Sequence, residues 1–391
     1  MVQRAKLYRH CRFNDGSVPL DIVMRIEISY DKFEKIHRIL VIQLGDIGDV
    51  ICTAPALFAL KEAYPTARIS LLLREASKDL LEGMESIHKT FVVKKYSGAW
   101  LRKIFDQAAF IKDLRSEKFD LVFDLRADDR GAFMAVLSGA PIRAALYYPD
   151  SPFWRNHIFT HLAKCEFSHE ISGPAEQSLR VIRPFGIGKD FRASLYPVSE
   201  HIRECVRASL PGELGNQATP WFTVSPFSKW SYKEWSRDKW VQIFNWLWNE
   251  YGVAVLVVGS KDEKIRADDM IRMCSGHVYN LSGKTKLSEL IELVRMSHLH
   301  ISVDTGAAHI AAAVGTPTIT IYGPSYSNAW AYPGKQHMVV LPDMECVPCH
   351  KTGCNGQYRS ICLETLEAEK VQRAIKSMVE EHCHITSRVS S

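Results

Sequence analysis

Short apolar runs that alternate with helical patterns dominate this 391-residue chain. The first run, Arg38–Leu44, is mostly apolar and ends at Gly45, which is the pattern of a strand buried on both faces of a sheet. A helical pattern follows and stops at Pro65, and a second apolar run begins at Ile69. A strand, a helix and a strand in this order predict a parallel βαβ unit.

The alternation continues through both halves of the chain. Further strands are expected at 69–73, 121–125, 142–147, 222–225, 253–258, 299–303 and 318–322. Between about 183 and 220 the chain is rich in proline and glycine around one short helix, which indicates a domain boundary. We therefore predict an α/β protein with two Rossmann-like, doubly wound domains facing a cleft. The expected parts are an N-terminal extension (1–36), two Rossmann-like domains (37–190 and 191–365) and a C-terminal helix and tail (366–391).

Composition excludes several classes of protein. Apolar residues make up 46% of the chain and charged residues 24%, which is typical of a globular protein and not of a disordered or fibrous one. The net charge of +5 is small for this length, so we expect no nucleic-acid partner. No apolar run approaches the ~18–20 residues of a membrane-spanning helix, and most of the ten cysteines lack regular spacing. We therefore expect a cytoplasmic location.

The first motif, Leu44–Val50, follows the first predicted strand and reads L-G-D-I-G-D-V. It does not fit the dinucleotide fingerprint G-x-G-x-x-G, because two carboxylates, Asp46 and Asp49, occupy the turn and would repel an anion. A carboxylate here suits the removal of a proton from a hydroxyl group. Capping of the following helix is the alternative, and the local pattern leaves both interpretations open.

The second motif, Ser302–Ser325, joins a strand end to a helix start. Asp304, Thr305 and Gly306 follow a strand, so the free N–H groups of the next helix favour a phosphate or pyrophosphate. His309 lies on the first turn of that helix, where an ordinary structural histidine is the alternative.

Two polar loops also follow predicted strands in the second half. The loop Ser225–Ser236 carries lysines and serines that suit pyrophosphate binding, and the loop Gly259–Glu263 carries carboxylates that suit a ribose hydroxyl. A solvated loop and an ordinary helix start are the alternatives. The candidate donor-binding residues of the two loops are Ser228, Lys229, Lys233, Asp262 and Glu263.

Together these segments resemble glycosyltransferase family 9, the ADP-heptose:lipopolysaccharide heptosyltransferases. The resemblance spans Arg38 to about Val371 and rests on G-D-I-G-D-V-x-x-T-x-P-A-L, on K-E-W after a polar loop, and on V-D-T-G-x-x-H-x-A-A-A-x-G-x-P-x-x-x-x-Y-G-P. It implies a glycosyltransferase B fold and an inverting, metal-independent transfer of heptose from ADP-heptose to the lipopolysaccharide inner core. Another nucleotide-sugar enzyme of this fold, such as an epimerase, and a non-catalytic nucleotide-sugar-binding protein are the alternatives.

The resemblance also implies roles for individual residues. Asp49 matches the general base that deprotonates the acceptor hydroxyl. The implied donor contacts are Ser228 and Lys233 for phosphate, Thr305 and Gly306 for pyrophosphate, Asp304 and His309 nearer the sugar, and Asp262 or Glu263 for ribose. We expect the acidic acceptor to contact Arg74, Arg126 and Arg130, which stand at or just past strand ends. For each arginine, a solvated surface position is the alternative.

Two segments depart from the short family pattern. Residues 1–36 carry Arg4, Lys6, Arg9 and Arg12, which suit contact with the anionic inner-membrane surface, and a packed or disordered extension is the alternative. The second segment contains a C-x-x-C pair and two further cysteines: Cys346, Cys349, Cys354 and Cys362. Four clustered cysteines suit a structural zinc or an iron–sulfur cluster, and a disulfide or free thiols are the alternatives.

Overall fold

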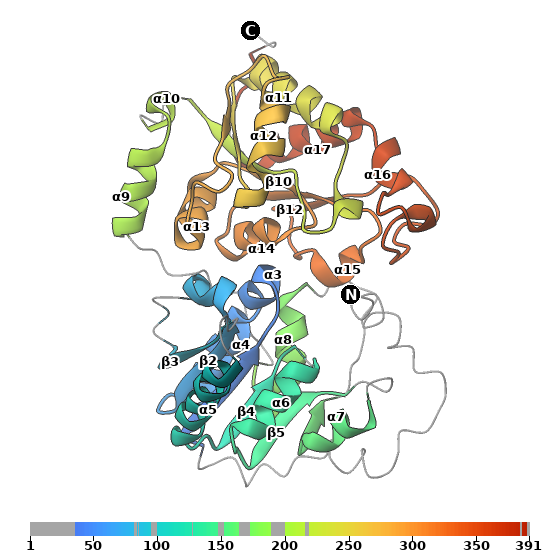
Figure 1. Ribbon diagram of the computed structural model, residues 1–391. Helices are drawn as coiled ribbons and strands as arrows, with labels where there is room; N and C mark the ends of the chain where they lie inside the picture. The colour runs from blue at the N-terminus through green and yellow to red at the C-terminus, as the bar shows by residue number, and fades with distance from the viewer. Residues whose placement is uncertain are drawn as a thin grey trace. The chain divides into compact units, whose positions relative to one another are not determined.

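The computed structural model describes residues 36–81, 84, 86–94, 100–126, 128–147, 152–163, 173–188, 200–215, 219–383 and 385–388. These residues form two compact units, one of residues 36–163 and 174–188 and one of residue 173 and residues 200–388 (Figure 1). Apart from Ile36, the expected N-terminal extension lies outside the described residues, as does the expected boundary between residues 190 and 191. The domain bounds therefore stay a prediction.

The first unit is built on a six-stranded, all-parallel sheet. In spatial order its strands are β3 (Lys89–Val93), β2 (Arg68–Arg74), β1 (Arg38–Gln43), β4 (Leu121–Asp124), β5 (Ile142–Leu146) and β6 (His161–Ala163). The helices are α3 (Ile47–Ile51), α4 (Ala54–Ala63), α5 (Trp100–Ser116), α6 (Asp129–Leu137), α7 (Phe153–Ile158) and α8 (Ala175–Ile182), with 3₁₀ turns η2 (Glu75–Leu81) and η3 (Arg183–Phe185). The first described strand, β1, lies in the middle of the sheet, and the later strands extend the sheet outward in both directions.

Strand β1 shows why this sheet forms. Ile39, Val41 and their neighbours are fully buried, and Val41 pairs with Leu71 of β2 and with Phe123 of β4. A strand that is apolar on both faces is stable only when helices cover both faces of its sheet. Helix α8 supplies part of that cover late in the sequence: it packs against α4, and the Ser178 hydroxyl donates a hydrogen bond to the Cys52 carbonyl.

The second unit repeats this architecture with a second parallel sheet. In spatial order its strands are β12 (His337–Val340), β11 (Thr318–Ile321), β10 (His300–Val303), β7 (Trp221–Ser225), β8 (Ala254–Val257) and β9 (Val278–Asn280). Its helices are α9 (Glu200–Ser209), α10 (Gly212–Gly215), α11 (Arg237–Tyr251), α12 (Lys264–Ile271), α13 (Leu287–Met296), α14 (Gly306–Ala313), α15 (Ser327–Trp330), α16 (Ile361–Thr365) and α17 (Ala368–Met378). Short turns η4 (Ser231–Lys233), η5 (Lys261–Glu263), η6 (Cys354–Gly356) and η7 (Val379–Cys383) complete it.

The two units have separate apolar cores. In the second unit, Val371 and Ile375 of α17 are fully buried against the same cluster as Phe244 of α11. Within the described residues, no helix is both long and apolar enough to cross a lipid bilayer. Two doubly wound parallel sheets with flanking helices confirm the fold class predicted from the sequence.

Candidate functional site

The first motif stands where β1 ends and α3 begins. Asp46 is the N-cap residue of α3, and the Asp49 carboxylate returns to accept the Asp46 backbone N–H at 2.8 Å. Asp49 therefore does cap the helix, as one of the two interpretations of the sequence predicted. A Cβ on Gly45 would lie 2.4 Å from Cβ of Asp49 and 2.7 Å from Nη1 of Arg126, so only glycine permits this close approach.

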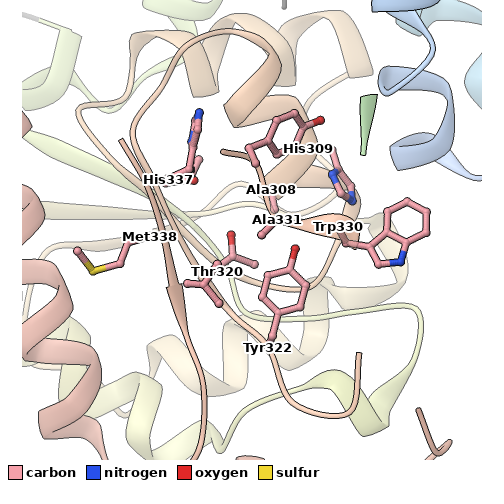
Figure 2. Close-up of a pocket in the computed structure, with 11 residues that line it drawn as sticks. Ala308, His309, Thr320, Tyr322, Trp330, Ala331, His337 and Met338 are labelled. Carbon is pink, nitrogen blue, oxygen red and sulfur yellow. Dashed lines mark hydrogen bonds between the residues drawn. The ribbon is translucent and has the colours of Figure 1, made fainter. Parts of the chain in front are cut away.

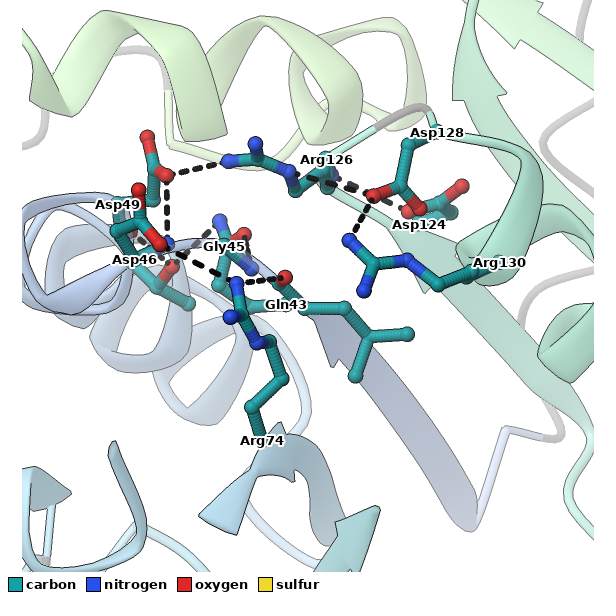
Figure 3. A network of polar contacts seen from close by, with 11 residues as sticks. Gln43, Gly45, Asp46, Asp49, Arg74, Asp124, Arg126, Asp128 and Arg130 are labelled. Atoms are coloured by element: carbon teal, nitrogen blue, oxygen red, sulfur yellow. Dashed lines mark hydrogen bonds and ion pairs between the residues drawn. The ribbon is translucent and has the colours of Figure 1, made fainter. Parts of the chain in front are cut away.

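Asp49 is also the partner of an arginine from the neighbouring strand end. The guanidinium of Arg126, just after β4, forms an ion pair with Oδ2 of Asp49 (Figure 3). On its other side the Arg126 Nε lies 3.4 Å from Asp128. Burial lowers the pKa of Arg126, but attraction to Asp49, Asp128 and Asp46 outweighs burial and leaves that pKa raised. The guanidinium therefore keeps its charge at any working pH.

The other two arginines expected at the acceptor site belong to the same network (Figure 3). Arg74, the last residue of β2, lies 3.2 Å from the Asp46 carboxylate, and Arg130, on α6, lies 3.1 Å from that of Asp128. The three arginines come together because β2, β1 and β4 are neighbours and end at the same edge of the sheet. Each is paired with a carboxylate, so this edge is a balanced network rather than a bare cationic patch.

The sequence analysis missed two members of this network, Asp124 and Asp128. Asp124 ends β4, is fully buried, and accepts the backbone N–H of Arg126 at 3.1 Å. Asp128 is the N-cap of α6 and accepts the Gly131 N–H. The available signal was the charged run D-L-R-A-D-D-R immediately after a buried strand.

The second unit brings together Lys233 of η4 and Asp304, which follows β10. Their side chains form an ion pair, with Asp304 almost entirely buried. Burial raises the pKa of Asp304, but Lys233, a hydrogen bond from Ser325 and the charge of His309 outweigh burial and lower it. Asp304 is therefore held as a carboxylate. Ser325, after β11, was not among the expected site residues.

Two other predicted residues adjoin this ion pair. Thr305 is the N-cap of α14, and Gly306 is its first residue, so the free N–H groups at the start of α14 follow Asp304 directly. The Ser228 hydroxyl lies 3.4 Å from the Asp304 carbonyl oxygen, and the Ser228 backbone N–H donates to Glu234 at 3.0 Å. Ser228, Thr305 and Gly306 thus lie around one helix start.

Glu234 is a further residue that the sequence analysis did not single out. Besides accepting the Ser228 N–H, its carboxylate takes a two-pronged contact from Arg266, whose guanidinium lies 4.5 Å from the centre of the Phe227 ring. Glu234 thereby ties the loop after β7 to α12. In the sequence, Glu234 is the glutamate of the K-E-W motif, and its place in that motif could have identified it.

His309 is buried on the first turn of α14 among aromatic rings. Its ring centre lies 5.9 Å from that of Trp330 (Figure 2). The ring centre of Tyr332 lies 5.8 Å from it. Together with His337 and Tyr322 these residues line a cavity of about 10 Å³, the size of one water molecule. His309 thus combines structural packing with an electrostatic effect on Asp304.

The remaining predicted donor residues occupy more exposed positions. In η5, Glu263 accepts the Ser260 N–H at 2.6 Å, so it caps this helical start, and Asp262 is exposed beside it. The ammonium of Lys229 lies 5.7 Å from the centre of the Trp230 ring. These contacts do not decide which of Asp262 and Glu263 meets a ribose, so both stay predictions.

The four clustered cysteines follow β12 and extend to α16. All four are free thiols, and Cys362 is buried. Burial first, and the neighbouring Cys346, Cys349 and Cys354 next, raise the pKa of Cys362 to about 11. In the part of the chain that the structure describes, no group of three or more His, Cys, Asp or Glu side chains is arranged to hold a metal ion. A bound metal here stays a prediction.

The sequence of this chain matches a known protein family and curated members of it. A sequence model of glycosyltransferase family 9 (heptosyltransferase) matches residues 107–358. Lipopolysaccharide heptosyltransferase 3 of Escherichia coli (strain K12) is 27% identical over 341 residues, covering 85% of this chain and 96% of the relative.

Two solved structures share the fold. A family 9 glycosyl transferase from Veillonella parvula has a TM-score of 0.70 at 20% identity, covering 88% of this chain and 97% of that one. The ADP-heptose lps heptosyltransferase II of E. coli has a TM-score of 0.68 at 17% identity, covering 88% and 99%. The family match extends over more than half of the sequence and includes Lys233 and Asp304. The chain belongs to glycosyltransferase family 9.

Proposed function

We propose that this glycosyltransferase moves a heptose from ADP-heptose to the lipopolysaccharide inner core, with inversion at the anomeric carbon. The observation that carries the proposal is Asp49, a carboxylate placed among three arginines at the edge of the first sheet. The likeness to heptosyltransferases over 85% of the chain supports the choice of sugar and acceptor.

The second unit binds the donor in this proposal. The diphosphate is met by Lys233, by the Ser228 hydroxyl and by the free N–H groups that begin at Thr305 and Gly306, which supply positive charge and hydrogen bonds. These contacts stabilise the negative charge that develops on ADP as it leaves. Asp262 or Glu263 accepts a hydrogen bond from a ribose hydroxyl.

The first unit supplies the base and binds the acceptor. Arg74, Arg126 and Arg130 meet the acidic groups of the acceptor, and Asp49 removes the proton of its hydroxyl group. The acceptor oxygen then forms a bond to the anomeric carbon, and the bond from that carbon to the diphosphate breaks with its electron pair on ADP. One in-line displacement inverts the configuration, so no second nucleophile is needed.

We also propose that the protein works at the inner-membrane surface, because its acceptor is a lipid. Exposed apolar side chains on two helices of the first unit support this: Phe105 and Ile104 on α5, and Phe133 on α6, are each more than half exposed. Apolar side chains of this kind suit insertion into a headgroup layer. Co-sedimentation with anionic vesicles, lost in Phe105→Ser, tests the contact.

The enzymatic proposal is tested with a panel of nucleotide sugars, with and without lipopolysaccharide that lacks heptose. We expect ADP release from ADP-heptose that depends on the acceptor, together with a mass increase of the acceptor. Conversion of the nucleotide sugar into an isomer without acceptor would indicate an epimerase. Tight binding of a nucleotide sugar with no turnover under either condition would indicate a non-catalytic binding protein.

A further inference from the structure

In the structure, the Asp49 carboxylate is engaged, meaning that one of its oxygens is occupied by hydrogen bonds from other groups of the protein. Its Oδ2 accepts two hydrogen bonds, one from the Asp46 backbone N–H at 2.8 Å and one from the Arg126 guanidinium (Figure 3). Both side chains of the ion pair are mostly covered, with 18% of Asp49 and 16% of Arg126 exposed. A carboxylate oxygen offers about two lone-pair sites, so these two donors leave Oδ2 little room to accept a proton from a further hydroxyl group.

Arg126 has another carboxylate within reach. Its Nε lies 3.4 Å from Asp128, which also pairs with the 61% exposed Arg130. An anion that binds Arg130 and Arg126 competes with both Asp128 and Asp49 for the same guanidinium groups. Moving Arg126 away from Asp49 therefore exchanges one anionic partner for another and leaves no buried cation unpaired, which keeps the cost of the exchange low.

We propose that Arg126 is a positioning residue that keeps Asp49 engaged until an anionic acceptor binds, and so suppresses transfer of the sugar to water. The proposal rests on the proposed function, which takes Asp49 as the base. When the anionic group of the acceptor takes over the Arg126 guanidinium, Oδ2 of Asp49 loses one donor. The acceptor hydroxyl takes that place and gives up its proton.

The wasteful reaction that this contact suppresses is hydrolysis of the donor. A water oxygen bonds to the anomeric carbon, the bond from that carbon to the diphosphate breaks with its electron pair on ADP, and the proton of water passes to Asp49. Water carries no anionic group, so it does not compete for Arg126. Asp49 therefore stays engaged when only water is present.

The decisive variant is Arg126→Gln, assayed for ADP release from ADP-heptose without acceptor. We expect hydrolysis about 3- to 10-fold faster than in the unmodified protein, because Oδ2 of Asp49 then carries one donor fewer and can accept the proton of water. Transfer to lipopolysaccharide falls, mainly through a higher acceptor KM. Arg126→Lys, which keeps a cation, stays close to the unmodified hydrolysis rate. Arg115→Gln, which removes an exposed arginine of α5, changes neither reaction.

Two further measurements keep the proposal falsifiable. In the double variant Arg126→Gln with Asp49→Asn, the gain in hydrolysis disappears if it passes through Asp49. In the unmodified protein at saturating donor, inorganic phosphate speeds hydrolysis relative to chloride of the same ionic strength, whereas Arg126→Gln shows no such response. The phosphate measurement decides the question even if Arg126→Gln melts at a lower temperature.

Several results would overturn the proposal. They are hydrolysis in Arg126→Gln no faster than in the unmodified protein, a gain that survives Asp49→Asn, or no response of the unmodified protein to phosphate. Each of these results is compatible with acceptor-dependent transfer. It therefore contradicts only the role proposed for Arg126 and not the proposed function. An unmodified protein that releases no ADP from ADP-heptose with acceptor present would contradict the proposed function itself.

Discussion

The ammonium group of Lys233 is paired with the carboxylate of Asp304, 71 positions later in the chain. Asp49 and Arg126, 77 positions apart, stand in the same relation in the first unit. Each pair joins residues that follow neighbouring parallel strands. In both units, the cation expected to meet an anionic substrate is therefore neutralised in advance by a carboxylate. Binding exchanges partners rather than filling an empty cationic site, which favours selectivity over raw affinity.

Loss of donor contacts should weaken nucleotide binding. We expect Lys233→Ala and Thr305→Val each to weaken ADP binding by about 1–3 kcal/mol, measured by calorimetry. Lys233→Ala also leaves the buried Asp304 without its ion-pair partner and should lower the melting temperature. The matched control is Lys370→Ala on α17, which breaks the ion pair between Lys370 and Asp343. Unchanged ADP affinity in both site variants would place the nucleotide elsewhere.

Loss of the base should affect turnover rather than donor affinity. Asp49→Asn keeps the size of the side chain and one oxygen that can accept the Asp46 N–H, but it removes the proton acceptor. We expect turnover to fall by ~10²–10⁴ while ADP affinity changes little. Asp46→Asn, which removes the neighbouring carboxylate of the same turn, serves as the control and should lose far less. Near-normal turnover in Asp49→Asn would exclude it as the base.

A single methyl group should disturb the edge of the first sheet. A Cβ on Gly131 would lie 2.5 Å from the buried Asp124 carboxylate, which in turn accepts the Arg126 N–H. We expect Gly131→Ala to lower stability by about 1–3 kcal/mol and to reduce transfer. Gly212→Ala is the control, because a Cβ there meets no atom within 4 Å. Equal melting temperatures of the two variants would contradict this prediction.

A buried histidine, His300, and a half-buried one, His337, should make stability depend on pH. Burial lowers the pKa of His300 to about 3, and burial with His382 lowers that of His337 to about 4. The unfolded chain therefore binds protons, near pH 6.5 and below, that the folded chain does not. Above pH 6.5 these histidines do not reduce the free energy of unfolding. Below it, that free energy falls by about 1.4 kcal/mol per histidine for each pH unit, down to about pH 4. In thermal melts, His300→Asn should flatten this slope, and an unchanged slope would refute the assignment.

The clustered cysteines make a prediction about metal content. Four sulfur donors suit a tetrahedral metal, although the described residues include no arranged metal site, so binding must draw the thiols together. We expect about one zinc per chain in protein purified without a histidine tag, or iron with visible absorbance. Chelation should then lower the melting temperature. Cys205→Ser, on α9, is the control. A metal-free preparation with full activity and four titratable thiols would leave these residues as free thiols.

Buried strands were predictable and edge strands were not. Continuous apolar runs identified β1, β4, β8, β10 and β11, because a strand buried on both faces admits few polar residues. None of the four edge strands was predicted: β3, β9 and β12 are short and half exposed, and β6 has only three residues. Lys89 opens β3. Helix α5 was missed for a related reason: exposed Ile104 and Phe105 blur its amphipathic pattern.

The sequence indicated that the candidate site residues stand at strand ends, but it did not indicate which of them pair. Asp49, Asp304, Arg126 and Arg130 follow strands and Arg74 ends one, and the carboxyl ends of the strands in a parallel sheet share one edge. Arg126 contacts Asp49 because β4 lies beside β1 in the sheet. The order of the strands along the chain does not indicate that these two strands are neighbours. Contacts of Glu234 and Ser325 depend likewise on side-chain directions, which no periodicity encodes.

The late position of α8 has a consequence for biosynthesis. All six strands of the first sheet emerge from a ribosome before Ala175–Ile182, yet α8 covers part of α4. A nascent chain that ends at β6 therefore holds a complete sheet with one helix face still bare, a surface on which chaperones act. We expect the half that contains Asp49 to resist protease only after α8 has been translated. Any fragment made to study that half alone must extend at least through residue 188.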